Sequence, residues 1–304
     1  MVAVPPVGIR RRAAMAPAAG SPHRDEILLG DAAATLAILP AASVHLAMTS
    51  PPYNVGIPYR GYADDLHPDA YLEWLARVWK ALYRVLVPGG RFALNVAPTS
   101  IKEFHPIHHD LARGLRKMGY IMRTEIIWYK QTMGRRTAWG SWRSPSNPHI
   151  IPSWEYVLVF SKGQWNLPGP KEAIDITSEE FQRFSDGFWE LKPERKRRGH
   201  PAPFPEQLVE RIVKYYSYRG NVVLDMFGGS GTVAAVARAT GRHYLYIDRS
   251  PEYCEAALSR VAAAEPPPGW EVPPPRAVVP GAGAPAPRPE RTAAAAAGPG
   301  PLPS

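Results

Sequence analysis

Apolar residues follow two rhythms along the chain. Short runs rich in Val, Ile and Leu alternate with longer stretches in which apolar residues recur every three or four positions. The short runs are typical of buried strands and the longer stretches of amphipathic helices, so their alternation predicts an α/β fold with a parallel sheet covered by helices. Seven strands are predicted, at 27–29, 44–49, 91–96, 121–129, 155–161, 222–226 and 244–247. Five helices are predicted, at 69–87, 107–118, 205–216, 232–240 and 251–263.

Four segments depart from these rhythms. Residues 1–24 and 266–304 are rich in Ala and Pro and show neither periodicity. They cannot bury enough apolar surface to offset their chain entropy, so we expect a disordered basic arm and a disordered tail on either side of a folded domain at 25–265. Residues 131–152 and 163–199 carry tryptophans among arginines and prolines. That composition indicates two loop-rich insertions into the domain.

Charge and cysteine content narrow the function classes. The formal net charge is +9, with arginines in short runs, which favours a polyanionic partner such as a nucleic acid. The single cysteine, Cys254, excludes a disulfide within the chain and a cysteine-ligated zinc site, and it fits a reducing cytoplasm. No apolar run approaches the roughly 20 residues that span a bilayer, so we expect no membrane function.

A strand, a glycine-rich turn and a helix start follow one another at 222–232. The turn reads Asp-Met-Phe-Gly-Gly-Ser-Gly-Thr from Asp225 to Thr232. Glycines permit positive φ and close approach to the backbone, and the helix start offers unpaired N–H groups to a small polar ligand. A second strand ends in Asp248, at the spacing of a carboxylate that binds a ribose. The glycines match neither the dinucleotide fingerprint nor a phosphate-binding loop, and a plain turn without a ligand is the alternative.

The strand predicted at 44–49 runs into Ser50-Pro51-Pro52-Tyr53-Asn54. Consecutive prolines fix the backbone and present carbonyl oxygens rigidly. An amino group with two hydrogens can donate one to a proline carbonyl and one to the serine hydroxyl, which frees the nitrogen lone pair to attack an electrophilic methyl group. The tyrosine offers a flat face on which a base can stack, and a base within a duplex must flip out to reach it. An ordinary surface turn is the alternative.

Together these segments resemble the S-adenosylmethionine-dependent DNA amino-methyltransferases, which make N4-methylcytosine or N6-methyladenine. The Ser-Pro-Pro-Tyr motif precedes the glycine loop, which resembles the circularly permuted β-class order. The resemblance runs from about Ile27 to Ala263. It implies a doubly wound, mostly parallel, seven-stranded Rossmann-like methyltransferase fold with a loop-rich target-recognition insertion. It also implies S-adenosyl-L-methionine as the cofactor and double-stranded DNA as the partner.

Matching positions take over the roles of the family motifs. Leu29-Gly30-Asp31 is similar to the segment near the cofactor adenine, and residues 199–206 resemble the cofactor-side motif "HPA-x-FP". The implied catalytic residues are Ser50, Pro51, Pro52 and Tyr53. The implied cofactor-binding residues are Asp31, His200, Pro201, Phe204, Glu206, Asp225, Phe227, Gly228, Gly229, Ser230, Gly231, Thr232 and Asp248. The residues expected to contact DNA are Asn54, Lys130, Arg135, Arg136, Arg143, Arg195, Lys196, Arg197 and Arg198, and no metal ligand is implied.

Three further segments resemble family motifs that contain aromatic residues. Residues 127–130 resemble the "W-x-K" strand near the target base, and residues 186–190 resemble the "D-x-W-E" segment after the target-recognition insertion. Trp154-Glu155-Tyr156 departs from the usual "HEY" by a tryptophan, for which the sequence offers no physical reason. For each tryptophan, core packing and base contact are equal alternatives.

The residue that opens the Ser-Pro-Pro-Tyr motif bears on the choice of base. Within the family, serine there accompanies N4-cytosine methylation and aspartate N6-adenine methylation, so we expect N4-methylcytosine, with N6-methyladenine as the alternative. Carbon-5 methylation needs a cysteine nucleophile, and Cys254 lies on a predicted helix away from the motif. A non-catalytic basic nucleic-acid-binding module and a protein-amide methyltransferase are the alternatives from other classes. The sequence leaves open the recognition sequence, a cognate restriction endonuclease and a homodimer, and it fits a bacterial protein of the cytoplasm and nucleoid.

Overall fold

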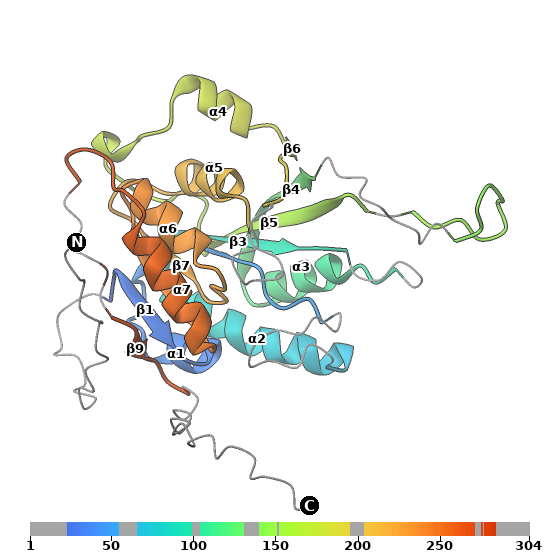
Figure 1. The fold of residues 1–304 in the computed structure, drawn as a ribbon, viewed down its shortest axis with the longest axis horizontal. Coiled ribbons are helices and arrows are strands. Elements are labelled where there is room, and N and C mark those ends of the chain that lie inside the picture. The colour runs from blue at the N-terminus through green and yellow to red at the C-terminus, as the bar shows by residue number, and fades with distance from the viewer. Residues whose placement is uncertain are drawn as a thin grey trace, which may run out of the picture.

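The computed structural model describes residues 23–54, 66–98, 104–130, 140–150, 152–194, 204–270, 275 and 277–283. Nine strands form one sheet in the order β6-β4-β5-β3-β2-β7-β8-β1-β9 (Figure 1). All neighbouring pairs are parallel except those that β5 makes with β3 and β4. The strands are β1 (Glu26–Leu29), β2 (Val44–Thr49), β3 (Leu86–Val96), β4 (Tyr120–Tyr129), β5 (Trp154–Lys162), β6 (Phe188–Glu190), β7 (Val222–Asp225), β8 (His243–Asp248) and β9 (Val279–Pro280).

Helices cover both faces of this sheet, which confirms the doubly wound, mostly parallel α/β fold. Side chains alternate along the strands: Ile247 of β8 joins the core beneath α1, α2 and α3, whereas Tyr246 joins the core beneath α5, α6 and α7. No helix in the described part of the chain is long and apolar enough to cross a membrane. The helices are α1 (Ala32–Ile38), α2 (Pro68–Val85), α3 (Ile107–Lys117), α4 (Ser178–Phe184), α5 (Glu206–Tyr216), α6 (Thr232–Ala239) and α7 (Pro251–Ala262), with a 3₁₀ turn, η1, at Lys171–Ala173.

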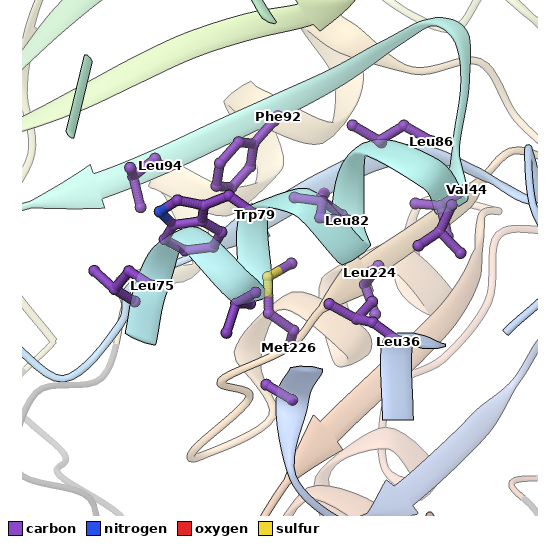
Figure 2. Close-up of a cluster of buried hydrophobic side chains, with 14 of the residues drawn as sticks. Leu36, Val44, Leu75, Trp79, Leu82, Leu86, Phe92, Leu94, Leu224 and Met226 are labelled. Carbon is purple, nitrogen blue, oxygen red and sulfur yellow. The ribbon is translucent and has the colours of Figure 1, made fainter. Parts of the chain in front are cut away.

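Large side chains of α2 fix the central strands. Figure 2 shows Trp79 of α2 against Phe92 of β3, with Leu224 of β7 and Met226 just after it nearby. The two aromatic rings are 4.9 Å apart between centroids and both are almost completely buried. Aromatic burial of this kind contributes much of the stability of a core. Because β2 lies between β3 and β7, this packing holds the strand ends that carry the two sequence motifs.

The sheet has two strands more than the seven predicted. β6 has three residues and β9 has two, too short for an apolar rhythm to reveal them. β9 also differs from the disorder expected after residue 265, because it pairs in parallel with β1. The Gly281 N–H donates to the Leu29 carbonyl at 2.7 Å, and the Asp31 N–H donates to the Ala282 carbonyl at 3.1 Å. Backbone groups rather than side chains hold this segment, so composition did not indicate it.

The end of the first long helix also differs from the prediction. α2 ends at Val85, and β3 begins at the next residue, where Leu86 pairs with Val44 of β2. The Pro-Gly-Gly sequence at 88–90, which directly follows the helix predicted at 69–87, therefore lies inside a strand, at an irregularity in its pairing with β2. Gly89 has a φ of 76°, and a Cβ atom there would lie 1.9 Å from a backbone oxygen, so the position requires glycine.

The second insertion is more ordered than a loop. Between residues 163 and 194 it contains η1, α4 and β6. A buried ion pair anchors it: the fully buried guanidinium of Arg242, the residue just before β8, donates to both carboxylate oxygens of Asp175. The same guanidinium donates to the carbonyl of Ser217 at 2.8 Å, so its charge is paired and hydrogen-bonded. This part of the predicted target-recognition region is therefore attached to the core of the domain.

Candidate active site

The segments that carry the two motifs meet at one edge of the sheet. β2 and β7 are parallel neighbours, with Leu46 opposite Val223. Their carboxyl ends therefore lie side by side, and the turn after β2 leaves the sheet beside the glycine loop after β7. A hydrogen bond joins them directly, because the Thr49 hydroxyl donates to Asp225 Oδ1 at 2.6 Å. The structure thus brings together two motifs whose strands end 176 residues apart in the sequence.

The glycine loop is packed too tightly for larger residues. A Cβ atom on Gly228 would lie 2.1 Å from the ring of Tyr246, far inside van der Waals contact. Gly229 and Gly231 have φ values of 47° and 74°, in the left-handed region that favours glycine. The Tyr246 hydroxyl donates to the Gly229 carbonyl at 2.8 Å, which ties the loop to β8. The loop backbone is thus held where a ligand can approach it closely.

Two buried carboxylates flank this loop. Asp248 ends β8 and accepts a hydrogen bond from the Gly229 N–H at 2.9 Å. Asp225 ends β7 and accepts from Thr49 and, at 3.1 Å, from the Phe227 N–H. Burial raises the pKa of Asp225 to about 7 and raises that of Asp248 as well. Ionised carboxylates are costly in such surroundings, so a ligand that donates hydrogen bonds or carries positive charge is favoured here.

Asp225→Asn is expected to remove a pH dependence of stability. Because burial raises the pKa of Asp225 from 3.8 to about 7, the folded protein binds this proton more tightly than the unfolded chain does. The stability it contributes is fully present below about pH 4 and is lost as the pH rises through 7. Asparagine keeps an oxygen for both hydrogen bonds but does not ionise.

The free energy of unfolding of the cofactor-free protein should therefore differ between variant and wild type in a pH-dependent way. We expect the free energy of unfolding of the variant, relative to that of the wild type, to rise by about 2–3 kcal/mol from pH 5 to pH 8. Denaturant unfolding at the two pH values measures it. A difference in free energy of unfolding that stays constant with pH would contradict a raised pKa of Asp225.

Arg260 of α7 supports the glycine loop and was not expected from the sequence. Its guanidinium donates to the Thr232 hydroxyl at 2.7 Å, to the carbonyl and hydroxyl oxygens of Ser230 at 3.3 Å, and to Glu206 Oε1 at 2.7 Å. Ser230, Thr232 and Glu206 are expected cofactor residues, and in the structure their side chains contact this arginine. Arg260 lies 28 residues beyond Thr232. No motif spacing pointed to it.

Three other expected cofactor residues have well-defined surroundings. Asp31 caps α1, because its Oδ1 accepts a hydrogen bond from the Ala34 N–H at 3.0 Å. Phe204 is partly buried against the core beneath α5, α6 and α7. Phe227, in the glycine loop, packs against Trp74 of α2 with ring centroids 5.5 Å apart. Phe227 therefore lies between the loop and α2.

Five polar side chains form a connected network at the Ser-Pro-Pro-Tyr turn. The Ser50 hydroxyl donates to the Tyr53 hydroxyl at 2.7 Å, which donates to Glu155 Oε2 at 3.2 Å. The side-chain amide of Asn95 donates to the Tyr53 hydroxyl at 2.8 Å and to Glu155 Oε2 at 2.6 Å. Lys130 forms an ion pair with the other oxygen of Glu155. Lys130, expected to contact DNA, is thus paired within the protein, and sequence reasoning gave no role to Asn95 or Glu155.

Two further contacts fix the ends of the turn. The Tyr71 hydroxyl of α2 donates to the Pro52 carbonyl at 2.7 Å. Asn54 has a φ of 57°, and its side-chain amide exchanges two hydrogen bonds with the backbone of Leu66, at 2.6 and 2.7 Å. Residues 55–65 between them lie outside the described residues. Asn54, expected to contact DNA, therefore also joins the two ends of this segment.

The tryptophans of the "W-x-K" and "D-x-W-E" segments belong to the core. Trp128 and Trp189 pair across β4 and β6, and both are buried. The Trp128 indole N–H donates to the Leu191 carbonyl at 2.8 Å. Of the two alternatives for these side chains, packing is therefore the one the structure supports. Asp186 accepts a hydrogen bond from the Phe188 N–H at 2.8 Å, which closes the turn before β6.

Cys254 is not placed to act as a nucleophile. It is fully buried on α7, with its sulfur 3.7 Å from the backbone oxygen of Asp248. Burial raises the pKa of the Cys254 thiol well above its ordinary value. A nucleophilic cysteine needs a stabilised thiolate, so this site favours chemistry that proceeds without one.

Arg143 is the third of the expected DNA contacts that the structure describes, after Lys130 and Asn54. Arg143 is exposed on an arm, residues 140–150, which projects away from the sheet in Figure 1. A backbone bridge between Gly140 and Pro148 closes this arm, and Trp142 on it is 70% exposed. The other expected contacts lie outside the described residues: Arg135, Arg136, Arg195, Lys196, Arg197 and Arg198 for DNA, and His200 and Pro201 for the cofactor.

Comparison with known proteins agrees with this geometry. Residues 44–259 match a family model described as DNA methylase. The chain is 37% identical over 160 residues to the type II methyltransferase M.MjaVI of Methanocaldococcus jannaschii. The aligned residues cover 52% of this chain and 82% of that relative. It is 27% identical over 260 residues to the DNA adenine methyltransferase YhdJ of Escherichia coli, covering 78% and 83% respectively. The crystal structure of TTHA0409 from Thermus thermophilus in complex with S-adenosyl-L-methionine superposes with a TM-score of 0.65 at 33% identity, over 81% of this chain and 95% of that one.

The fold and the site define an S-adenosylmethionine-dependent methyltransferase. The residues present fit this cofactor, because the glycine loop leaves no space for side chains on Gly228 and two buried carboxylates, Asp225 and Asp248, flank it. The chain belongs to the DNA methylase family, whose members methylate the exocyclic amino group of cytosine at N4 or of adenine at N6.

Proposed function

We propose that the Ser-Pro-Pro-Tyr turn receives the amino group of a base that has flipped out of double-stranded DNA. Two acceptors support this proposal. The Ser50 hydroxyl gives its hydrogen to Tyr53, so its oxygen is left to act as an acceptor. The Pro51 carbonyl is the second acceptor in this proposal, since the neighbouring Pro52 carbonyl is engaged by the Tyr71 hydroxyl of α2. An amino group satisfies both with its two N–H groups, whereas the O6 of guanine or the O4 of thymine would set oxygen against oxygen.

In this proposal the protein accelerates methyl transfer by holding the target amino group in the reactive orientation. The sulfonium of S-adenosylmethionine supplies the electrophilic methyl group. The Ser50 and Pro51 oxygens hold the two amino hydrogens, so that the nitrogen lone pair points out of the plane of the base toward the glycine loop. The nitrogen forms a bond to the methyl carbon as the carbon–sulfur bond breaks, and the nitrogen then releases one proton to solvent. Asp225 and Asp248 would hold the cofactor beside the glycine loop, and the Thr49–Asp225 hydrogen bond joins this loop to the strand that carries the Ser-Pro-Pro-Tyr turn.

Cytosine N4 is the proposed target, because serine stands at position 50. Among DNA amino-methyltransferases this serine accompanies N4-cytosine methylation, and aspartate accompanies N6-adenine methylation. The second candidate is N6 of adenine, which the likeness to the E. coli adenine methyltransferase favours. The amino group and the two acceptors are the same in both cases, so only the ring of the base distinguishes them.

Nucleoside analysis decides between the two bases. Unmethylated duplex DNA is incubated with the protein and S-adenosylmethionine, digested to nucleosides and separated by mass spectrometry. We expect N4-methyldeoxycytidine and no N6-methyldeoxyadenosine. The reverse result would overturn the choice of base while leaving amino methylation in place. A Ser50→Ala variant in the same assay is the control, since it loses one acceptor and should form far less product of either kind.

The arm at 140–150 is the proposed DNA-contacting element of the described part of the chain. It belongs to the insertion between β4 and β5, and Lys130, the residue after β4, is part of the network beside Ser50 and Tyr53. Its exposed Arg143 and Trp142 offer a cation for phosphate and a ring for stacking. Arg143 has a φ of 55°, and hydrogen bonds between Ser141 and Asn147 close the turn that carries it.

A further inference from the structure

We propose that Glu155 is a positioning residue that fixes the direction of the hydrogen bonds ending at Ser50. It would force the Ser50 oxygen to act as an acceptor toward the target amino group, although Glu155 itself does not touch the base. The inference rests on the proposed role of Ser50 and deepens it, since it says why a serine hydroxyl, which can donate or accept, is held in the accepting state.

The first step is the charge state of Glu155. Three donors converge on its carboxylate: Lys130 on Oε1, and the Asn95 amide and the Tyr53 hydroxyl on Oε2. The Lys130 ammonium and the Asn95 amide nitrogen can only donate to it, and the positive charge of Lys130 stabilises the ionised form. Glu155 is 7% exposed, so water does not replace any of these contacts easily. Two N–H donors, one of them a cation, therefore favour a carboxylate that only accepts, with the Tyr53 hydroxyl donating to it as the structure shows.

The second step passes this requirement to Ser50. The Tyr53 hydroxyl has one hydrogen, and it donates that hydrogen to Glu155. Its oxygen can then only accept, and it accepts from the Asn95 amide at 2.8 Å and from the Ser50 hydroxyl at 2.7 Å. Ser50 has thus given away its single hydrogen. Both of its lone pairs remain for the N–H of an amino group.

The Asn95 amide reinforces this order. Asn95 is 1% exposed and presents its NH₂ group to both Tyr53 and Glu155. Its own oxygen has no hydrogen-bond partner among the described residues, so the amide orientation is set by the carboxylate rather than by a bond of that oxygen. Turning the amide around would place its oxygen against Glu155, which the charge forbids.

Glu155→Gln tests the proposal with almost no change of shape. A glutamine amide has one accepting and one donating end, but Lys130 needs an acceptor on one side, and Asn95 and Tyr53 need one on the other. With its oxygen on Lys130, the amide NH₂ would donate to Tyr53, whose hydroxyl would then donate to Ser50. The Ser50 hydrogen would point at the incoming amino group and repel it.

The experiment is a set of double-mutant cycles read by single-turnover transfer of a tritiated methyl group to unmethylated duplex DNA. We expect Glu155→Gln to slow the transfer at least tenfold, a cost of about 1.4 kcal/mol or more, with S-adenosylmethionine affinity by calorimetry changed less than about twofold. In a Tyr53→Phe background, where the link to Ser50 is already broken, the same substitution should slow transfer less than about threefold. In a Ser50→Ala background it should likewise have little further effect.

Glu125→Gln is the matched control, since Glu125 is an exposed glutamate on the neighbouring strand β4 and should leave transfer unchanged. A purely structural role for Glu155 predicts equal slowing in all three backgrounds together with weaker cofactor binding, and that result would overturn the proposal, as would unchanged transfer in Glu155→Gln. A different result would show that the proposed function itself is wrong: Ser50→Ala alone would then transfer the methyl group at the wild-type rate.

Discussion

Asp225→Ala is expected to weaken S-adenosylmethionine binding about 30-fold, whereas Tyr53→Ala leaves cofactor affinity within about twofold of the wild type. Asp225 borders the glycine loop, and a ligand that brings positive charge, such as the ammonium of the methionine end, would stabilise its buried carboxylate. Losing a charge-assisted hydrogen bond of this kind costs about 2 kcal/mol. Tyr53 lies in the turn after β2 and contacts Ser50, Asn95 and Glu155. Calorimetric titration of each variant with the cofactor measures the difference.

Asp225→Asn is the matched control for the first variant. It keeps an oxygen for Thr49 and for the Phe227 N–H, so it removes the charge without leaving those donors unpaired. If charge carries the affinity, the asparagine variant should bind almost as weakly as the alanine variant. The affinity of the wild type should also fall as the pH drops below about 7, because the proton on Asp225 must leave before a cation binds. Equal loss of cofactor affinity in the Tyr53 and Asp225 variants would contradict this division of the site.

Asp175→Ala is expected to destabilise the whole domain by about 3–5 kcal/mol, the largest effect on stability among the substitutions considered. Its partner, Arg242, is fully buried, so removing the carboxylate leaves a guanidinium charge in the core with only carbonyl and hydroxyl oxygens around it. Arg219 also approaches Asp175, at 3.6 Å, and would lose its contact as well. The free energy of unfolding in denaturant measures the effect.

Two comparisons make this result specific to the ion pair. Glu172→Ala removes an exposed carboxylate from the same segment and should change stability by less than about 0.5 kcal/mol. Asp175→Leu combined with Arg242→Met replaces the pair by apolar side chains and should recover much of the loss, since no charge is then left unpaired. A small effect of Asp175→Ala alone would show that solvent reaches the guanidinium.

The strands and helices with strong apolar rhythm were predictable from the sequence, and those held by other means were not. The strand at 44–49 has the predicted bounds, and α5, α6 and α7 end within a residue of the predicted positions. α1 was missed because its seven residues, Ala32–Ile38, are too few to show a helical period. α4 was missed although Thr177 and Glu180 form a capping box, a local signal that the apolar pattern did not reinforce.

In the candidate site, the sequence predicted which motif residues would lie together. It did not predict the side chains that contact them. Ser50, Tyr53, Asp225 and the glycines stand in ordered motifs whose spacing reflects backbone geometry. Arg260 and Asn95 reach the site from α7 and β3, and only the packing of those elements determines their neighbours. The buried state of Glu155 was equally hidden, because its surroundings depend on the antiparallel insertion of β5 between β3 and β4. Such contacts depend on long-range packing, which one sequence does not display.

β9 has a practical consequence for handling the protein. It covers β1 with backbone hydrogen bonds and lies over the segment that contains Asp31. A shortened chain that stops at residue 265, where the apolar pattern ends, would lack β9. It would expose unpaired N–H and carbonyl groups of β1 at the edge of the sheet. An exposed sheet edge can pair with strands of other molecules. The trimmed protein would therefore self-associate or precipitate, even though every motif residue was retained.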